Sequence, residues 1–241
     1  MPTLRTRYVQ SVVPVPDSPP QSGLLVFKEA TTNTKLGSGG KRITKGRFRG
    51  MPLYGLTLEE RATCWSGCPN LELCYGDNMP FAKRYTPGKK LEAAIRKDVQ
   101  LLSKKHAKGF VVRLHVLGDF YSTAYVAHWS RMLLTYPALH LFGYTHWPAD
   151  HPIGKAVATL VQHFPDRVAF RRSDRTDQSD PLPGAMTIAK GEPAAPGTVI
   201  CPEQMGRTAS CTTCGLCMNL ETSVSFIDHS RRGLRTLPLA A

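Results

Sequence analysis

The chain has 241 residues, with 31 Lys and Arg against 18 Asp and Glu and a formal net charge of +13. At 41% hydrophobic residues it is long and apolar enough to fold, which excludes a wholly disordered protein. An odd count of seven cysteines, with no signal peptide before them, argues against a secreted disulfide scaffold. No apolar run reaches the eighteen residues of a membrane span, so we expect a cytoplasmic protein without a membrane partner.

Strand and helix patterns alternate along most of the chain. Residues 1–22 carry four prolines between positions 14 and 20 and are predicted to be a flexible arm. A first strand is expected at 24–29, followed by a basic, glycine-rich loop over 31–50. Apolar spacing then predicts helices over 88–107, 122–136 and 152–164. Strands are expected at 110–116, 139–144, 167–172, 185–189, 197–200 and 223–227.

This alternation predicts an α/β fold, either a partial (β/α) barrel or an open parallel sheet. A cysteine-rich loop is expected before it and a cysteine-rich C-terminal extension after it. The predicted parts are the arm 1–22, an α/β core 23–200 containing the cysteine loop 64–74, a cysteine-cluster segment 201–228 packed on the core, and a basic tail 229–241. Because sites gather at the carboxyl ends of parallel strands, the rim is expected at 118–121, 145–147, 173–177 and 201–203.

The cysteines fall into two sets. The first set, C-x3-C-x5-C, is Cys64, Cys68 and Cys74; the second set is Cys201, Cys211, Cys214 and Cys217. Closely spaced thiols let a short loop surround one metal centre, whereas free cysteines usually bury singly. A [4Fe-4S] cluster accepts three cysteines and leaves one iron open, so it is predicted at the first set. The second set suits a second [4Fe-4S] cluster or zinc, and a thiol exchange role also stays open.

A three-cysteine loop feeding β/α units resembles the radical S-adenosylmethionine superfamily, whose usual loop is C-x3-C-x2-C. That resemblance implies S-adenosylmethionine as a cofactor, bound near Gly118 and Asp119, and an auxiliary cluster on the second set. A closer resemblance covers about 24–217. The runs MPLYGLTLEERATCWSGCPNLELCYGDNM, RLHVLGDFYS, FGYTHW, CPEQ and CGLC are similar to the phage and bacterial family catalogued as gene product eighty-eight. It implies a phage or mobile-element context and names no reaction.

Polar side chains on the predicted strands mark a candidate pocket. Period-two alternation puts Arg113 and His115 on one face of the 110–116 strand, with Asp119 at its rim. Arg171 and Arg172 lie on the strand after next. We predict that the catalytic residues are Arg113, His115, Asp119, Tyr144, His146 and Asp174. Together with the first cysteine loop they are expected to form one pocket that binds an anionic group. The alternatives are a solvent-exposed strand face and, for His115, an ordinary core histidine.

The positive charge is concentrated in two regions. Residues 28–49 hold seven Lys and Arg, and residues 83–113 hold ten against two acids. Such a footprint, with the aromatic residues Phe48, Tyr54, Trp65 and Tyr75 as candidate stacking surfaces, is typical of a phosphate-backbone binder. The expected macromolecular partner is a nucleic acid; the alternative is a basic surface that only favours solubility.

Two functions follow from these patterns. The first is an iron-sulfur protein, of radical S-adenosylmethionine type, that acts on a nucleic acid or nucleotide and needs a reductant protein. The second is a non-catalytic nucleic-acid-binding protein stabilised by zinc or a cluster. The sequence decides neither the substrate nor the oligomeric state.

Overall fold

A computed structural model describes residues 12–20, 23–38, 40–69, 71, 74–174 and 179–228. Eight strands form one sheet in the order β2-β3-β5-β6-β7-β8-β10-β9. Among the described residues, every neighbouring pair is parallel except β2 and β3. The strands are β2 (Lys28–Glu29), β3 (Leu53–Leu56), β5 (Phe110–Leu114), β6 (Leu139–Thr145), β7 (Val168–Ser173), β8 (Gly184–Ile188), β9 (Thr198–Ile200) and β10 (Ser223–Ile227).

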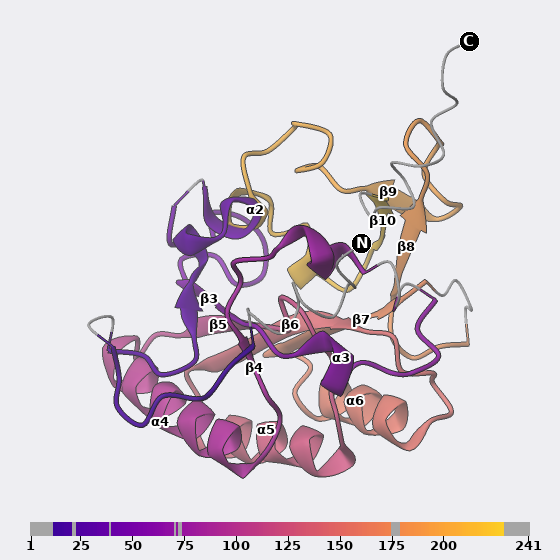
Figure 1. The fold of residues 1–241 in the computed structure, drawn as a ribbon. Coiled ribbons are helices and arrows are strands. Elements are labelled where there is room, and N and C mark those ends of the chain that lie inside the picture. Colours follow the sequence, from indigo (N-terminus) through magenta and orange to yellow (C-terminus); the bar gives the residue numbers. More distant parts are fainter. Residues whose placement is uncertain are drawn as a thin grey trace.

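Three long helices cover one face of this sheet. They are α4 (Lys89–Lys105), α5 (Thr123–Thr135) and α6 (Pro152–His163), and they lie next to one another beneath the strands (Figure 1). The hydroxyl of Ser122 accepts the N–H of Tyr125 at 3.1 Å and so caps α5. The buried stripes of the helices, including Ile95, Trp129 and Val157, pack on the strands as one core. The predicted α/β fold with a mostly parallel sheet is therefore confirmed.

The sheet is open. Within the described ranges no ladder joins β2 to β9, so there is no closed barrel. Both ends of the sheet, β3 on one side and β8 to β10 on the other, rise away from the helices (Figure 1). The result is a trough whose outer side carries the helices.

Irregular segments fill the inner side of the trough. The glycine-rich loop of 31–50 meets the second cysteine set there, where the N–H of Thr44 donates to the carbonyl of Thr212 at 2.8 Å. A second apolar core joins Phe142 of β6 to Met218. The short elements on this side are the 3-10 turn η1 (Ala30–Thr32), α2 (Thr34–Gly37), α7 (Cys211–Cys214) and the 3-10 turn η3 (Leu216–Met218).

The N-terminal part differs from the predicted elements. Most of the strand expected at 24–29 is not paired, because the N–H groups of Leu25, Val26 and Phe27 donate to the carboxylate of Asp98 on α4. Only β2 remains as a strand, and β3 joins the sheet without having been predicted. The cysteine loop therefore follows a strand of the sheet instead of preceding the sheet.

That loop contains three short elements, which are α3 (Glu60–Thr63), the 3-10 turn η2 (Tyr75–Asn78) and β4 (Arg84–Tyr85). Strand β4 pairs in parallel with β1 (Val12–Val13), which belongs to the segment predicted as an arm. No helix in the described ranges is both long and apolar enough to cross a membrane.

Candidate functional site

A cavity of about 590 Å³ lies at the carboxyl ends of the parallel strands. Its wall includes residues that directly follow or end three strands, which are Gly118, Asp119, His146, Ser173 and Asp174. The second cysteine set contributes Cys201 to the same wall. Part of the predicted rim therefore lines the cavity, whereas residues 120, 121, 145, 147, 202 and 203 are not in its wall and positions 175–177 lie outside the described residues.

Six of the seven cysteines line this one cavity. The loop after β3 supplies three of them and the C-terminal segment supplies the others, which gives Cys64, Cys68, Cys74, Cys201, Cys211 and Cys217. All seven cysteines are free thiols. In the part of the chain that the structure describes, no three Cys, His, Asp or Glu side chains already stand at metal-binding geometry. The metal ligands therefore remain a prediction, although the fold brings both sets to the same space.

Burial makes these thiols hard to ionise. It raises the pKa of Cys64 strongly, and the Asp119 carboxyl adds to this effect. Burial also raises the pKa of Cys74 to about 11, although the N–H of Gly76 opposes the rise. The pKa of Cys211 rises to about 12 for the same first reason. Thiolates in this cavity consequently need a compensating cation, as a metal centre would provide.

Arg113 of β5 is a cation without a counter-ion in this wall. Its guanidinium lies 5.6 Å from the ring centroid of Tyr144, and its Nε is buried with no acceptor among the described residues. Burial opposes the charge, but Tyr75, Tyr144 and the thiol of Cys211 outweigh it and raise the pKa of Arg113. An unpaired buried charge costs several kcal/mol. A thiolate-ligated cluster, which carries net negative charge, fits the chemistry of this position.

Asp119 joins the ends of β5 and β6. Its Oδ1 accepts the N–H of Phe120 at 2.7 Å, and its Oδ2 accepts the N–H of His146 at 2.8 Å and the hydroxyl of Thr145 at 3.2 Å. Burial raises the pKa of Asp119 to about 6, and these hydrogen bonds limit the rise. Both carboxylate oxygens thus hold the shape of the rim.

His146 forms a pair with Asp174 on the cavity wall. The distance from His146 Nε2 to Asp174 Oδ2 is 3.0 Å, and Asp174 Oδ1 accepts the N–H of Thr187 at 3.0 Å. Burial opposes ionisation of Asp174, but its hydrogen bonds to His146 and Thr187 outweigh this and lower its pKa. A histidine held by a carboxylate can hold or transfer a proton.

The family is shown by comparison with known proteins. The model of the family described as Gene product 88 matches residues 25–220, which include both cysteine sets and most of the cavity wall. The chain belongs to the Gene product 88 family. The resemblance seen in its cysteine loop and strand-end motifs is thereby confirmed, and so is the phage-related context. These comparisons give no support to a relationship with the radical S-adenosylmethionine superfamily.

Two relatives in this family come from phages. The chain is 31% identical over 136 residues to the Gene 88 protein of Mycobacterium phage D29, which covers 51% of the chain and 56% of that protein. It is 29% identical over 126 residues to the Gene 88 protein of Mycobacterium phage L5, covering 47% and 53%. The alignments thus span about half the length of each relative. No solved structure matches the chain.

In this Gene product 88 family member, His115 does not share the strand face of Arg113. Strand β5 ends at Leu114, so the alternation stops there, and the ring of His115 packs on Tyr125 of α5 and on Phe120. Its Nε2 lies 3.2 Å from the Tyr125 hydroxyl. Burial and the charge of Arg113 lower the pKa of His115 to about 3, so its ring is neutral. The expectation of a shared face is wrong, although both side chains reach the cavity.

The arginines of β7 hold the protein's own structure. Arg171 points to the inner side of the trough and donates to the carbonyls of residues 216, 217 and 219. Arg172 points to the helix side and pairs with Asp180 at 2.7 and 3.2 Å. Arg171 therefore anchors the second cysteine set to the sheet, and neither guanidinium lines the cavity.

The sequence did not reveal the support of the first cysteine loop. Glu60 of α3 forms a buried ion pair with Arg84, whose Nε lies 2.8 Å from Glu60 Oε2. Arg84 also donates to the carbonyls of Gly76, Met79 and Ala82 just after Cys74. The available signal was the presence of an arginine and a glutamate on either side of the cysteine motif.

Proposed function

We propose that the chain is an iron-sulfur protein in which Cys64, Cys68 and Cys74 ligate a [4Fe-4S] cluster at the cavity. The observation that carries this proposal is that two cysteine sets, far apart in the sequence, line one cavity that also contains the cation Arg113, whose buried Nε has no acceptor among the described residues. Three thiolates leave one iron of such a cluster open to the cavity.

The second set provides a further centre. Its four thiols suit a second [4Fe-4S] cluster or zinc, and its members are Cys201, Cys211, Cys214 and Cys217. Anchoring by Arg171 supports a role for this segment as a preformed wall of the cavity. The [4Fe-4S] form is our first choice, because a single chemistry then accounts for both sets.

A finer form of the proposal is an enzyme of radical S-adenosylmethionine type that acts on a nucleotide or nucleic acid. Support comes from the sequential order of β3, β5, β6, β7 and β8 with the long helices α4, α5 and α6 on one face, which resembles the winding of a (β/α) barrel wall. The cysteine loop also directly follows the first parallel strand. A reduced cluster would supply one electron for cleavage of S-adenosylmethionine, and a reductant protein would be needed.

The chain's own residues have separate tasks in this proposal. Gly118, with a φ of +87°, turns the backbone at the cavity wall, and Asp119 holds that turn next to His146. Arg113 offers its charge to an anionic group. The His146 and Asp174 pair takes up or releases a proton.

The test is anaerobic purification followed by iron, sulfide and zinc determination. Two [4Fe-4S] clusters predict about eight irons per chain. Replacing the first set (Cys64→Ser, Cys68→Ser, Cys74→Ser) should leave about four, and replacing all four cysteines of the second set should also leave about four. Ser66→Ala, an exposed change in the same loop, is the matched control and should retain all iron.

Zinc without iron would overturn the cluster proposal and favour the zinc-stabilised, non-catalytic nucleic-acid-binding protein. Iron that is unaffected by loss of the first set would overturn the ligand assignment. The finer form is tested by S-adenosylmethionine cleavage after chemical reduction of the iron-loaded protein. Absence of cleavage would refute that form while leaving the iron-sulfur assignment standing.

A further inference from the structure

The outer face of α4 carries charge of one sign. Its exposed cations are Lys89, Lys90, Arg96, Lys97, Lys104 and Lys105. Of the two acids of the helix, Asp98 is buried against the N–H groups of residues 25–27. Glu92 lies at the edge of this face next to α5, where it accepts the Tyr121 hydroxyl at 2.9 Å and its Oε2 lies 3.9 Å from His128 Nδ1. Asp17 pairs with Lys90 at 2.7 Å, and Lys97 also acts on its charge. Within the described ranges the five cations other than Lys90 form no ion pair.

This face has the dimensions of a backbone-binding surface. A helix of 17 residues is about 24 Å long from first to last residue. One strand of B-DNA presents a phosphate about every 3.4 Å along the axis, so about seven phosphates span that length. The six exposed cations of α4 are therefore similar in number to the phosphates along this length.

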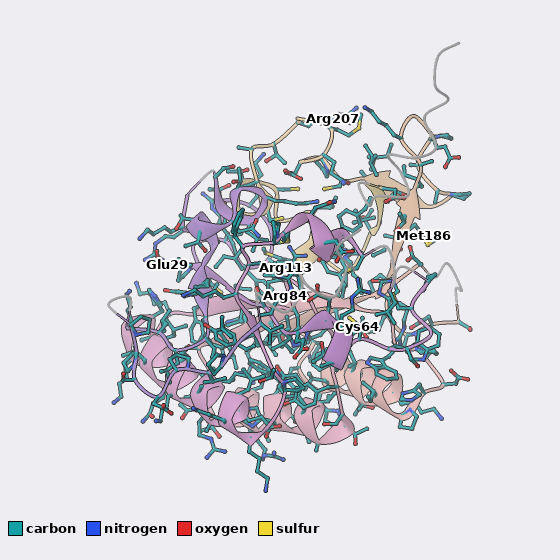
Figure 2. All side chains as sticks on the ribbon, in the orientation of Figure 1. Glu29, Cys64, Arg84, Arg113, Met186 and Arg207 are labelled. Carbon is teal, nitrogen blue, oxygen red and sulfur yellow. The ribbon has the colours of Figure 1, made fainter. Side chains whose placement is uncertain are left out.

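A neighbouring helix extends the charge. Arg131 of α5 is exposed, and it follows by about one turn His128, whose Nδ1 lies 3.9 Å from Glu92 Oε2 on α4. Burial lowers the pKa of His128, the Glu92 carboxylate opposes this, and the charges of Arg131 and Arg96 lower it further, so both guanidinium groups act on the same ring. Arg131 thus adds to the positive charge of α4 across a seam that also holds Glu92, and nitrogen-tipped side chains extend from this side of the molecule (Figure 2).

We propose that the outer face of α4, continued by Arg131, binds the phosphate backbone of double-stranded DNA without reading its sequence. The exposed positions of α4 include no aromatic residue on which single-stranded bases could stack. Phe48 and Tyr54, which the sequence suggested as stacking surfaces, are only 1% and 2% exposed. The apolar stripe of α4 is buried in the core, so it is not free to insert into a lipid surface.

This surface is independent of the cavity. It lies on the helix side of the sheet (Figure 1), whereas Cys211 and Cys217 pack on the second apolar core and no α4 residue lines the cavity. DNA binding therefore does not rest on the iron-sulfur proposal. The surface holds DNA against the protein by its charge and fixes the position of the duplex, and it takes no part in a reaction.

The experiment measures binding of the full chain to a fluorescent 20-base-pair duplex by anisotropy over a series of salt concentrations. If each of the five α4 cations that form no ion pair neutralises one phosphate, the slope of log K against log salt should be about −4.5. The variant Lys97→Glu with Lys104→Glu should weaken binding at least tenfold and make the slope shallower by about 2. The matched control, Lys155→Glu with Lys190→Glu, changes two exposed lysines outside α4 and gives the same net charge; it should weaken binding less than twofold.

Several outcomes would overturn the inference. They are no duplex binding at low salt, equal weakening by the two double variants, and tighter binding to a single strand than to the duplex. Binding to vesicles containing anionic phosphatidylserine, in place of the duplex, would assign the surface to a membrane. The first-set cysteine variant, if its circular dichroism shows that it is folded, should keep duplex binding, so this test and the iron test fail separately.

Discussion

Asp98 anchors the N-terminal segment to α4, and its removal should destabilise the whole fold. Its carboxylate accepts three N–H groups, from Leu25 at 2.7 Å, Val26 at 2.8 Å and Phe27 at 3.0 Å. All four residues are buried, so water cannot readily replace the lost acceptor. Each unpaired buried N–H costs about 1–3 kcal/mol. Because removal of the buried charge recovers part of this cost, we expect Asp98→Ala to lower the free energy of unfolding by about 3 kcal/mol.

The assay is urea unfolding of samples with matched iron and zinc content, read as a shift of the midpoint at constant slope. Lys97→Ala, at the adjacent exposed position, should change the free energy by less than about 0.5 kcal/mol. Hydrogen exchange gives a local readout, since the amides of residues 25–27 should lose protection in Asp98→Ala. A loss below 1 kcal/mol together with unchanged exchange at these amides would refute the reasoning.

Three further predictions concern the core and the first cysteine loop. The pKa of His115 is lowered to about 3, so the unfolded chain binds more protons between about pH 6.5 and pH 3, and stability falls as the pH drops through this window. Between pH 7.5 and pH 4.5 the free energy of unfolding of His115→Phe should therefore fall by about 2–3 kcal/mol less than that of the unsubstituted protein. The same shift of the urea midpoint in both proteins between these pH values would contradict this. Gly143→Ala should cost more than about 3 kcal/mol because its Cβ would stand 1.5 Å from the carbonyl oxygen of Leu114; a thermal midpoint close to that of the unsubstituted protein would disprove the close approach. Arg84→Met leaves the carboxylate of Glu60 buried without its partner and should cost about 3–5 kcal/mol, with part of the loss recovered when Glu60→Gln is added; no recovery in the double variant would argue against the ion pair as the cause.

The regular elements were predictable because they depend on local patterns. The stripe of Leu91, Ile95, Val99 and Leu102 and the N-cap of Ser122 are properties of neighbouring residues, and the helices appear where these signals stand. Strand β3 escaped prediction because its run LYGL contains a glycine and has no alternation. Burial on both faces removes the polar positions that would mark such a strand.

The site was predictable only in part. Strand ends indicated the rim at Asp119, His146 and Asp174, since parallel strands place their carboxyl ends together. The partners of Arg171 could not be predicted, because its acceptors are backbone carbonyls, which every residue possesses. The ion pair of Arg84 with Glu60 could not be predicted either, because the two residues are 24 positions apart and only the fold brings them together. The face of His115 was also out of reach, because it depends on where β5 stops.

The sequence by itself determined the two cysteine sets, the alternation of strands and helices and the excess of positive charge, because composition and spacing are present before folding. Only the tertiary structure decided that both cysteine sets line one cavity, since that depends on how segments over a hundred residues apart pack across the sheet. It also divided the basic region of 83–113. Burial made Arg84 an ion-pair partner and left Arg113 facing the thiols, while the helical period turned the lysines of α4 to the surface.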